Sequence, residues 1–242
     1  MSAAALAWEQ FRLERRLFWR NPSAAFFNFI LPLLLLVLVA SVFASDEHEL
    51  DVLIPGIAGM SVMATTFNAL AFNLTFLREQ GILKRVLGTP TPVASYFAGL
   101  LGSAVANAFV QVALVVVIGH LAYGVDWPSD VPLLAGFTAL GVTCFGALGI
   151  ALSHATPNFD SAPAYVNAVF LPVIFVSGVF YSSDDLPSVL KALARALPLK
   201  HLIDGFSAAI VGSSVDTLAA AAVIAGWGVV AAFLALRFFR WE

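Results

Sequence analysis

Residues 21–45 read NPSAAFFNFILPLLLLVLVASVFAS, a stretch of 25 residues without Asp, Glu, Lys or Arg. A helix that crosses the hydrocarbon core of a membrane needs about 20 largely apolar residues, because each residue adds about 1.5 Å of length. Five further uncharged stretches of comparable length occupy 52–77, 86–125, 131–159, 161–183 and 217–236. The sequence therefore predicts an all-α integral membrane protein with six transmembrane helices.

The composition excludes a water-soluble globule and a nucleic-acid-binding domain. Hydrophobic residues make up 60% of the 242 residues and charged residues only 11%, whereas soluble domains average about 25% charged residues. The net charge of −3 gives no basic face for nucleic acid, so no such partner is expected. The single cysteine, Cys144, and four scattered histidines offer neither an intrachain disulfide nor a metal cluster, and we predict no metal site and no catalytic residues.

The six spans are expected to form a single transmembrane domain over residues 1–242. Each must be helical, because lipid cannot satisfy free backbone polar groups. We place them at about 24–44, 55–76, 95–122, 132–153, 162–181 and 217–237. The first is too long for the apolar core of a signal peptide and is interpreted as a retained helix. The longest segment outside the spans, 182–216, is expected on the external side, with a short re-entrant or lid helix between Asp184 and Pro198.

The distribution of positive charge predicts the orientation. Nine of the 12 Lys and Arg residues precede the first span, follow the last, or lie between the second and third. Loops rich in Lys and Arg stay in the cytoplasm. We therefore expect a multi-pass protein with both termini cytoplasmic.

The first 22 residues combine aromatic and basic side chains at helical spacing. An amphipathic helix over 6–22 is expected to lie in the membrane interface, where its arginines can reach the headgroups of membrane lipids. The predicted interface residues are Trp8, Arg12, Arg15, Arg16, Trp19 and Arg20. Asn21-Pro22 should end this helix before the first span.

Neutral polar side chains recur at helical spacing within the second and third spans. One line, called here the polar stripe, contains Ser61, Thr65, Asn68, Phe72 and Thr75, and the third span adds Ser103, Asn107 and Gln111. Two interpretations remain open. Ser, Thr, Asn and Gln commonly join helices within membrane bundles, or these residues line a path for an amphipathic substrate without fixed charge. Mid-membrane carboxylates, which a proton-coupled transporter would need, are absent from the spans.

The loop between the second and third spans is amphipathic. Residues 77–90, called here the coupling segment, read LREQGILKRVLGTP. Ile82, Leu83, Val86 and Leu87 give an apolar face, while Arg78, Glu79, Lys84 and Arg85 give a charged one, which predicts a short cytoplasmic helix. A solvated basic loop is the alternative, although it would not need this much apolar surface.

Several motifs, in order, resemble the membrane subunit of a type-2 ABC exporter. They are Arg20-Asn21-Pro22, Pro55-Gly56 through Met60-Ser61, Arg78-Glu79-Gln80-Gly81 through Lys84-Arg85 with Thr89-Pro90, Ser177 through Tyr181, Leu186-Pro187, Leu197-Pro198-Leu199 and Asp204-Gly205. The resemblance covers nearly the whole chain and favours the compact bacterial drug or antibiotic exporter branch over the lipopolysaccharide and teichoic-acid branch.

The resemblance implies a half-transporter of the plasma membrane in which two chains pair, a homodimer being the expectation. A separate ABC ATPase subunit, carrying ATP and Mg, would dock under each chain. The residues expected to couple the ATPase to the membrane are Arg78, Glu79, Gln80, Gly81, Lys84 and Arg85, with a direct polar contact from Arg78 and Glu79.

The predicted function is that of an ABC transporter permease that exports a drug, antibiotic or lipid-like substrate. The chain contains no Gly-x-x-x-x-Gly-Lys-Ser/Thr phosphate loop, so it is not expected to be an enzyme. The alternatives are a subunit that exports lipid-linked glycans, a secondary transporter, a membrane enzyme acting on lipids, and a sensor or structural protein that is not coupled to ATP.

Overall fold

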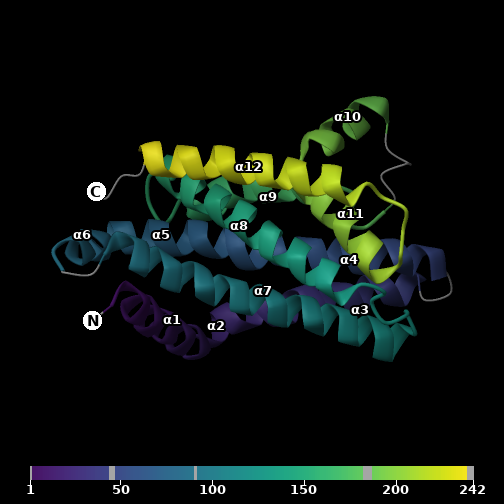
Figure 1. Ribbon diagram of the computed structural model, residues 1–242, viewed down its shortest axis with the longest axis horizontal. Helices are drawn as coiled ribbons and strands as arrows, with labels where there is room; N and C mark the ends of the chain where they lie inside the picture. The colour runs from purple at the N-terminus through teal and green to yellow at the C-terminus, as the bar shows by residue number, and fades with distance from the viewer. Residues whose placement is uncertain (1, 44–46, 90–91, 182–186, 239–242) are drawn as a thin grey trace.

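The computed structural model describes residues 2–43, 47–89, 92–181 and 187–238. All regular secondary structure in these ranges is helical (Figure 1). The elements are α1 (Ala3–Trp19), α2 (Pro22–Ala25), the π-helical η1 (Phe26–Ile30), α3 (Leu31–Phe43), α4 (Glu47–Met63), the π-helical η2 (Ala64–Asn68), α5 (Ala69–Glu79), α6 (Ile82–Leu87), α7 (Val93–Tyr123), α8 (Val131–Ala155), α9 (Ala162–Val176), α10 (Ser188–Ala196), α11 (Pro198–Ile210) and α12 (Thr217–Phe238).

The apolar helices correspond to the six predicted spans. Four are long and apolar enough to cross a membrane, namely Glu49–Glu79, Ala94–Tyr123, Val131–Ala155 and Thr217–Arg237, and two shorter ones cover Asn28–Val42 and Ala162–Val176. An integral membrane fold is thus supported, while the count of six crossings stays a prediction. Helix α9, which corresponds to the fifth predicted span, ends at Val176 instead of continuing to 181. The chain turns there through Gly178, whose φ is +74°.

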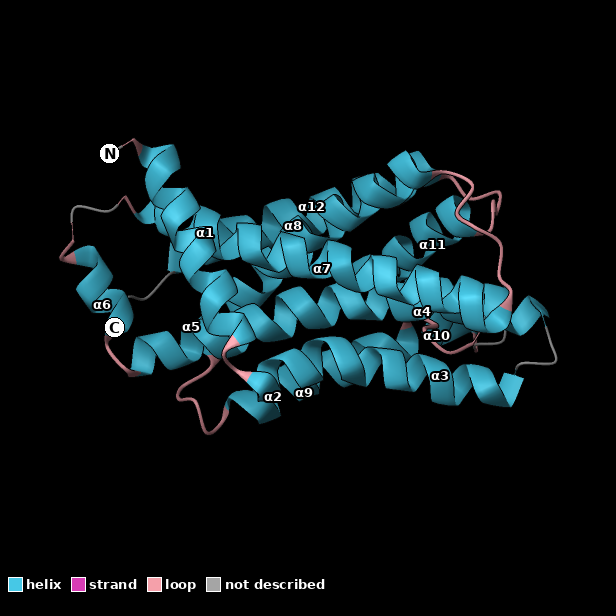
Figure 2. Cartoon of the chain, turned by 90° about the horizontal axis from the view of Figure 1, so that it is seen from below, coloured by secondary structure: helices cyan, strands magenta, loops and turns pink. Residues whose placement is uncertain are grey.

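The long helices run along one axis and form a bundle with two distinct ends (Figures 1 and 2). The start of α1, the short helix α6, the connection from α8 to α9 and the carboxyl end of α12 lie together at one end, called here the α6 end. Helix α10 lies at the opposite end. The two described termini are therefore on the same side of the bundle, as an even number of crossings requires.

The continuous helix formed by α4, η2 and α5 lies at the centre of the core. Within this helix, 83% of an apolar stretch of 18 residues is buried. Glycines let other backbones approach this helix closely. A Cβ added at Gly56 would lie 2.0 Å from the carbonyl oxygen of Val179, and one added at Gly149 of α8 would lie 2.6 Å from that of Phe67. These positions require glycine because the contacting atoms belong to backbone.

The segment 182–216, predicted to lie on the external side, differs from the prediction in one respect. Helix α10 covers most of the expected lid helix, and residues 182–186 of that prediction lie outside the described residues. Helix α11, however, is a core helix in contact with α4, α8 and α12. Its fully buried side chains include Leu199, Leu202 and Phe206. An ion pair between Lys200 and Asp204, one turn apart, allows a helix with two charged residues to be this buried.

Candidate functional site

The coupling segment does not form a single helix. Arg78 and Glu79 belong to the last turn of α5, and Ile82 to Leu87 form the separate helix α6. Gly81 joins the two helices in the left-handed conformation, with φ +65° and ψ 14°. This conformation is costly for residues with a Cβ and explains the break. Residues 90–91 of the segment lie outside the described residues.

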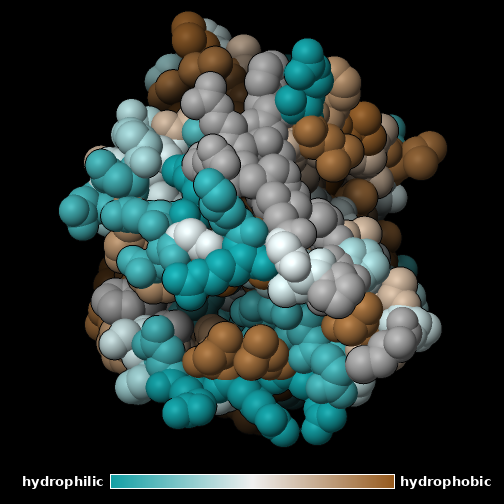
Figure 3. Space-filling view, turned by 90° about the vertical axis from the view of Figure 1, so that its left-hand side faces the viewer, coloured by the Kyte–Doolittle hydropathy of each residue, from teal (hydrophilic) through white to brown (hydrophobic). Residues whose placement is uncertain are grey.

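Helix α6 is held against the bundle by Leu83. Its side chain is only 1% exposed and packs in a small hydrophobic cluster with Leu70, Leu74, Tyr96 and Leu100, from α5 and α7. Lys84 and Arg85, the next two residues of α6, are exposed. Figure 3 views the molecule from the α6 end, where the surface is largely hydrophilic with a few apolar patches. Helix α6 therefore carries two exposed basic side chains and is anchored to α5 and α7 by Leu83.

Arg78 and Glu79 turn toward the connection between α8 and α9. The Arg78 guanidinium donates from Nη1 to the Ser153 carbonyl at 2.8 Å and from Nη2 to the Thr156 carbonyl. Carbonyls at the end of a helix lack intrahelical partners, and a cation there is favoured by the helix dipole. Glu79 Oε2 accepts a hydrogen bond from the Phe159 backbone N–H at 2.6 Å. Both side chains thus bind backbone groups of their own chain.

The hydroxyl groups of the polar stripe bond within their own helix. Ser61 donates to the Ile57 carbonyl at 2.7 Å, Thr65 to the Ser61 carbonyl at 2.8 Å, and Thr75 to the Ala71 carbonyl at 2.8 Å. All three side chains are buried. Because their donors are satisfied locally, these hydroxyls can pack against other helices without polar partners. Phe72 is half-buried at the margin of the main core.

The amides of the predicted path have different environments. Asn107 is buried and accepts a hydrogen bond from Arg15 through its Oδ1 atom. Gln111 is fully buried and its Nε2 atom donates to the Phe29 carbonyl at 3.5 Å. Among the described residues, Asn68 Oδ1 and Gln111 Oε1 are buried without a hydrogen-bond partner. Such atoms are energetically costly in a core, so these two oxygens are the least satisfied polar atoms of the predicted path.

Helix α1 packs along the first half of α7, in the same direction. Ser95 donates to the Ala3 carbonyl at 3.0 Å, a Cβ added at Gly99 would lie 2.5 Å from Gln10 Cβ, and further along Arg15 meets Asn107. Arg15 therefore points toward the protein, and its guanidinium also lies 5.8 Å from the Trp19 ring centroid. Sequence reasoning missed this contact, because nothing in the local pattern distinguishes Arg15 from its neighbours.

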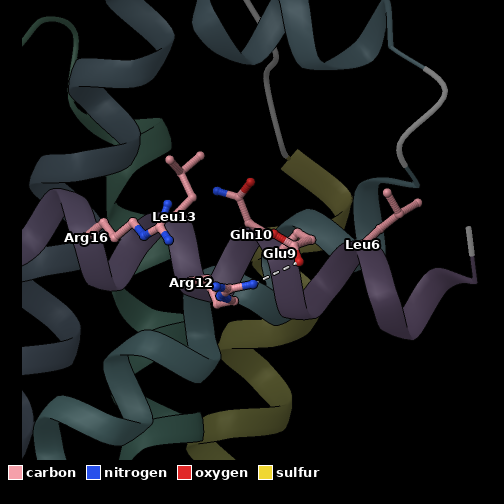
Figure 4. Close-up of a pocket in the computed structure, with 6 residues that line it drawn as sticks. All are labelled: Leu6, Glu9, Gln10, Arg12, Leu13 and Arg16. Carbon is pink, nitrogen blue, oxygen red and sulfur yellow. Dashed lines mark hydrogen bonds and ion pairs between the residues drawn. The ribbon is translucent and has the colours of Figure 1, made fainter.

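The outer side of α1 carries the other predicted interface residues. Trp8 and Trp19 are each 59% exposed, and Arg12, Arg16 and Arg20 are exposed as well. Figure 4 shows a hollow beside α1, lined by Leu6, Glu9, Gln10, Arg12, Leu13 and Arg16, with an ion pair of 3.4 Å between Arg12 and Glu9. Contact of the exposed tryptophans and arginines with lipid stays a prediction.

We expect Asn107→Leu to loosen α1 from α7. The change leaves the half-buried Arg15 guanidinium without this acceptor, and hydrogen bonds to charged groups contribute about 1.5–3 kcal/mol. Hydrogen exchange of the α1 amides should accelerate. The double variant Arg15→Leu/Asn107→Leu should recover much of the protection, because removing both partners leaves no unpaired polar group. Equal exchange in all three proteins would show that the contact does not hold α1.

A pH dependence of α1 docking is expected from Glu14. Burial raises the pKa of this carboxyl above its ordinary value, partly offset by a hydrogen bond from Gln10 at 2.8 Å. A raised pKa means that the docked helix favours the protonated form. Docking is therefore tightest below the ordinary pKa and weakens as the pH rises through the raised one. Glu14→Gln should abolish this dependence, measured as α1 protection factors across the acidic range, and an unchanged dependence would contradict the assignment.

Comparison with known proteins identifies the class and then the family. The apolar helical bundle defines an α-helical integral membrane protein, and no group of three His, Cys, Asp or Glu able to hold a metal is found in the described ranges. A family model described as "ABC-2 type transporter" matches residues 4–211. The chain belongs to the ABC-2 type transporter family, a family of membrane permease subunits, which confirms the resemblance noted in the sequence.

Three curated relatives are similar to parts of the chain, and two of them are named as transport permeases. The chain is 25% identical over 158 residues to Nodulation protein J of Rhizobium meliloti (strain 1021), covering 65% of this chain and 60% of that protein. It is 24% identical over 163 residues to the probable multidrug ABC transporter permease YbhS of Escherichia coli (strain K12), covering 62% and 40%. It is 26% identical over 160 residues to the inner membrane transport permease YadH of the same strain, covering 66% and 62%. The chain thus spans less than two thirds of the length of these relatives.

Proposed function

We propose that the chain is the transmembrane permease subunit of an ATP-driven exporter. Membership of the ABC-2 family supports a partnering ABC ATPase, and the observation that carries the proposal is the geometry of α6. This helix lies at one end of the bundle, with Leu83 buried beneath it and Lys84 and Arg85 exposed above. A separate ATPase subunit, holding ATP and Mg, docks on this surface.

The coupling segment carries the motion of the ATPase into the membrane. Its residues Arg78, Glu79, Gln80, Gly81, Lys84 and Arg85 all lie at the junction of α5 and α6. In this proposal α6 receives the movement of the ATPase and α5, which continues into η2 and α4, converts it into a shift of the spans. Two chains pair in the plasma membrane as a homodimer, and the α6 end, with both termini, is cytoplasmic.

The substrate is proposed to be amphipathic or hydrophobic, such as a drug, an antibiotic or a lipid-like molecule. The described spans carry neutral polar groups in place of fixed charges, which suits a cargo without a strong charge. Thr65 and Asn68 of the polar stripe fall in the π-helical η2, and such turns frequently occur at functional sites. The relative named a probable multidrug permease also favours this class.

Co-purification tests the proposal. The chain is expressed with its candidate ATPase, purified in mild detergent, and placed in lipid vesicles, where ATP hydrolysis is measured with and without drug-like compounds. A stable complex of two permease and two ATPase chains, with hydrolysis stimulated by compounds, is the expected result. A chain that purifies alone, or hydrolysis that no compound changes, would contradict an ATP-driven exporter of such substrates.

Asn68→Leu is expected to change transport more than stability if the polar stripe lines the cargo path. Its Oδ1 atom has no partner among the described residues, so an apolar replacement removes an unsatisfied group and folding should be preserved. The prediction is a change of about tenfold in the rate for at least one compound, as expected for one lost hydrogen bond to cargo. Thr138→Ala in α8 is the control outside the stripe, because it removes a buried hydroxyl that bonds only locally, to the Leu134 carbonyl at 2.7 Å. Unchanged transport of every compound would assign Asn68 to helix packing.

A further inference from the structure

The α8–α9 connection is joined to the coupling segment through backbone groups. It comprises residues 156–161, between the end of α8 at Ala155 and the start of α9 at Ala162. Arg78 binds carbonyls at the end of α8, Glu79 binds the Phe159 N–H, and the Phe76 and Phe159 rings meet edge to face at 5.4 Å. Phe76, Arg78 and Glu79, close together at the end of α5, therefore contact the end of α8 and the loop that follows it.

We propose that Arg78 and Glu79 are positioning residues that fasten the α8–α9 connection to the end of α5. This inference rests on the proposed function and revises the sequence-based expectation that the two residues contact the ATPase directly. Movement delivered to the coupling segment is then shared by α5, α8 and α9. Without the two side chains, α6 would move α5 alone.

Hydrogen bonds within the α8–α9 connection make it a compact loop. Asn158 and Ser161 bond each other, with the Ser161 N–H donating to Asn158 Oδ1 at 2.9 Å and the Ser161 hydroxyl donating to the Asn158 carbonyl at 2.9 Å. The Thr156 hydroxyl donates to the Leu152 carbonyl at 3.0 Å. The loop is thus folded on itself between two helices, and a pull on Phe159 moves it as a unit.

Glu79 could act as a direct contact to the ATPase or as a positioning residue that holds the loop. These two roles predict opposite results when Glu79 is replaced by the neutral glutamine. A carboxylate that forms an ion pair with an ATPase cation loses its function when its charge is removed. A carboxylate that accepts a backbone N–H can be replaced by glutamine, whose side-chain carbonyl accepts the same hydrogen bond. Glu79→Gln and Glu79→Ala therefore separate a positioning residue from a contact residue.

The first measurement uses the chain of residues 1–242 without any ATPase. Spin labels are attached to the exposed positions 80 and 160 through Gln80→Cys and Asp160→Cys, in a background in which the single native cysteine is removed by Cys144→Ala. We expect a narrow distance distribution in this protein and with Glu79→Gln, and a clearly broader one with Glu79→Ala. An equally narrow distribution with Glu79→Ala would overturn the proposal, whether or not an ATPase binds.

The second measurement uses the complex with the ATPase in vesicles and records substrate transported per ATP hydrolysed. Glu79→Ala should lower this ratio about tenfold, the scale of one lost charge-assisted hydrogen bond, while Glu79→Gln should stay near the wild-type ratio and both variants keep the ATPase bound. If Glu79→Gln uncouples as strongly as Glu79→Ala, the residue acts through its charge and the proposal is wrong. If the wild-type complex shows no ATP-driven transport, the proposed function fails while the label distances still decide whether the joint exists.

Discussion

Gly56→Ala is expected to prevent the accumulation of folded protein. The added Cβ would lie 2.0 Å from the Val179 carbonyl oxygen and 2.8 Å from its carbonyl carbon. Both are backbone atoms that follow Gly178, whose φ of +74° fixes the turn at the end of α9. No rotamer change can relieve this overlap, so α4 must move away from the turn. Overpacking of a core costs about 1–3 kcal/mol or more, a large share of a typical stability margin.

The yield of monodisperse protein after detergent extraction, and its melting temperature, measure this effect. Gly136→Ala is the matched control, because the space around Gly136 of α8 is open and alanine is the better helix former by about 1 kcal/mol. The control should fold as well as the wild type or slightly better. Normal yield and melting temperature for Gly56→Ala would mean that the close approach of α4 to the α9 turn is not part of the stable fold.

Leu83→Asp is expected to abolish ATP-driven transport while the membrane bundle stays folded. Leu83 is 1% exposed and anchors α6 to α5 and α7 in a cluster separate from the main core. Burying a carboxylate among apolar side chains is so unfavourable that α6 should detach instead. Transport should fall by at least about tenfold, since losing a buried leucine costs about 2–5 kcal/mol.

Two measurements distinguish detachment of α6 from unfolding of the chain. Trypsin cleavage after Lys84 and Arg85 should accelerate strongly in Leu83→Asp, whereas the elution profile of the intact protein should not change. Leu83→Ile keeps the volume and the apolar character. Such exchanges usually cost less than about 1.5 kcal/mol, less than the loss of a buried leucine, so α6 should stay docked and transport should be retained. Full transport with a readily cleaved α6 would show that docking of this helix is not needed for coupling.

Much of the bundle could be predicted from the sequence because lipid imposes a simple rule. A stretch of about 20 residues without charge has few alternatives to a spanning helix, and each predicted span overlaps an apolar helix of the structure. This rule did not predict helix α11 as part of the core. Lys200 and Asp204 interrupt its apolar pattern, and in the structure they pair with each other across one helical turn while the apolar residues around them enter the core.

The contacts around the candidate site could not be predicted in the same way. The amphipathic pattern of residues 77–90 indicated a helix with a charged face, but the direction of each charged side chain depends on helices far away in the sequence. Arg78 and Glu79 find backbone partners near the end of α8, and Arg15 finds Asn107. A local pattern describes which residues share a face and says nothing about what a distant loop brings opposite them.

The turn at Gly81 has a mechanical consequence. Only Gln80 and the left-handed Gly81 separate α5 from α6, and apart from its chain neighbours no atom lies within 4 Å of where a Cβ on Gly81 would be. Such a joint transmits tension along the chain but resists little torque. Rotation of α6 therefore reaches the bundle through the cluster around Leu83, in which Val86 also packs and which includes Leu70 and Leu74 of α5. The rotation is then transmitted by side-chain packing. The size of that packed contact, more than the length of α6, determines how far the membrane helices rotate when α6 does.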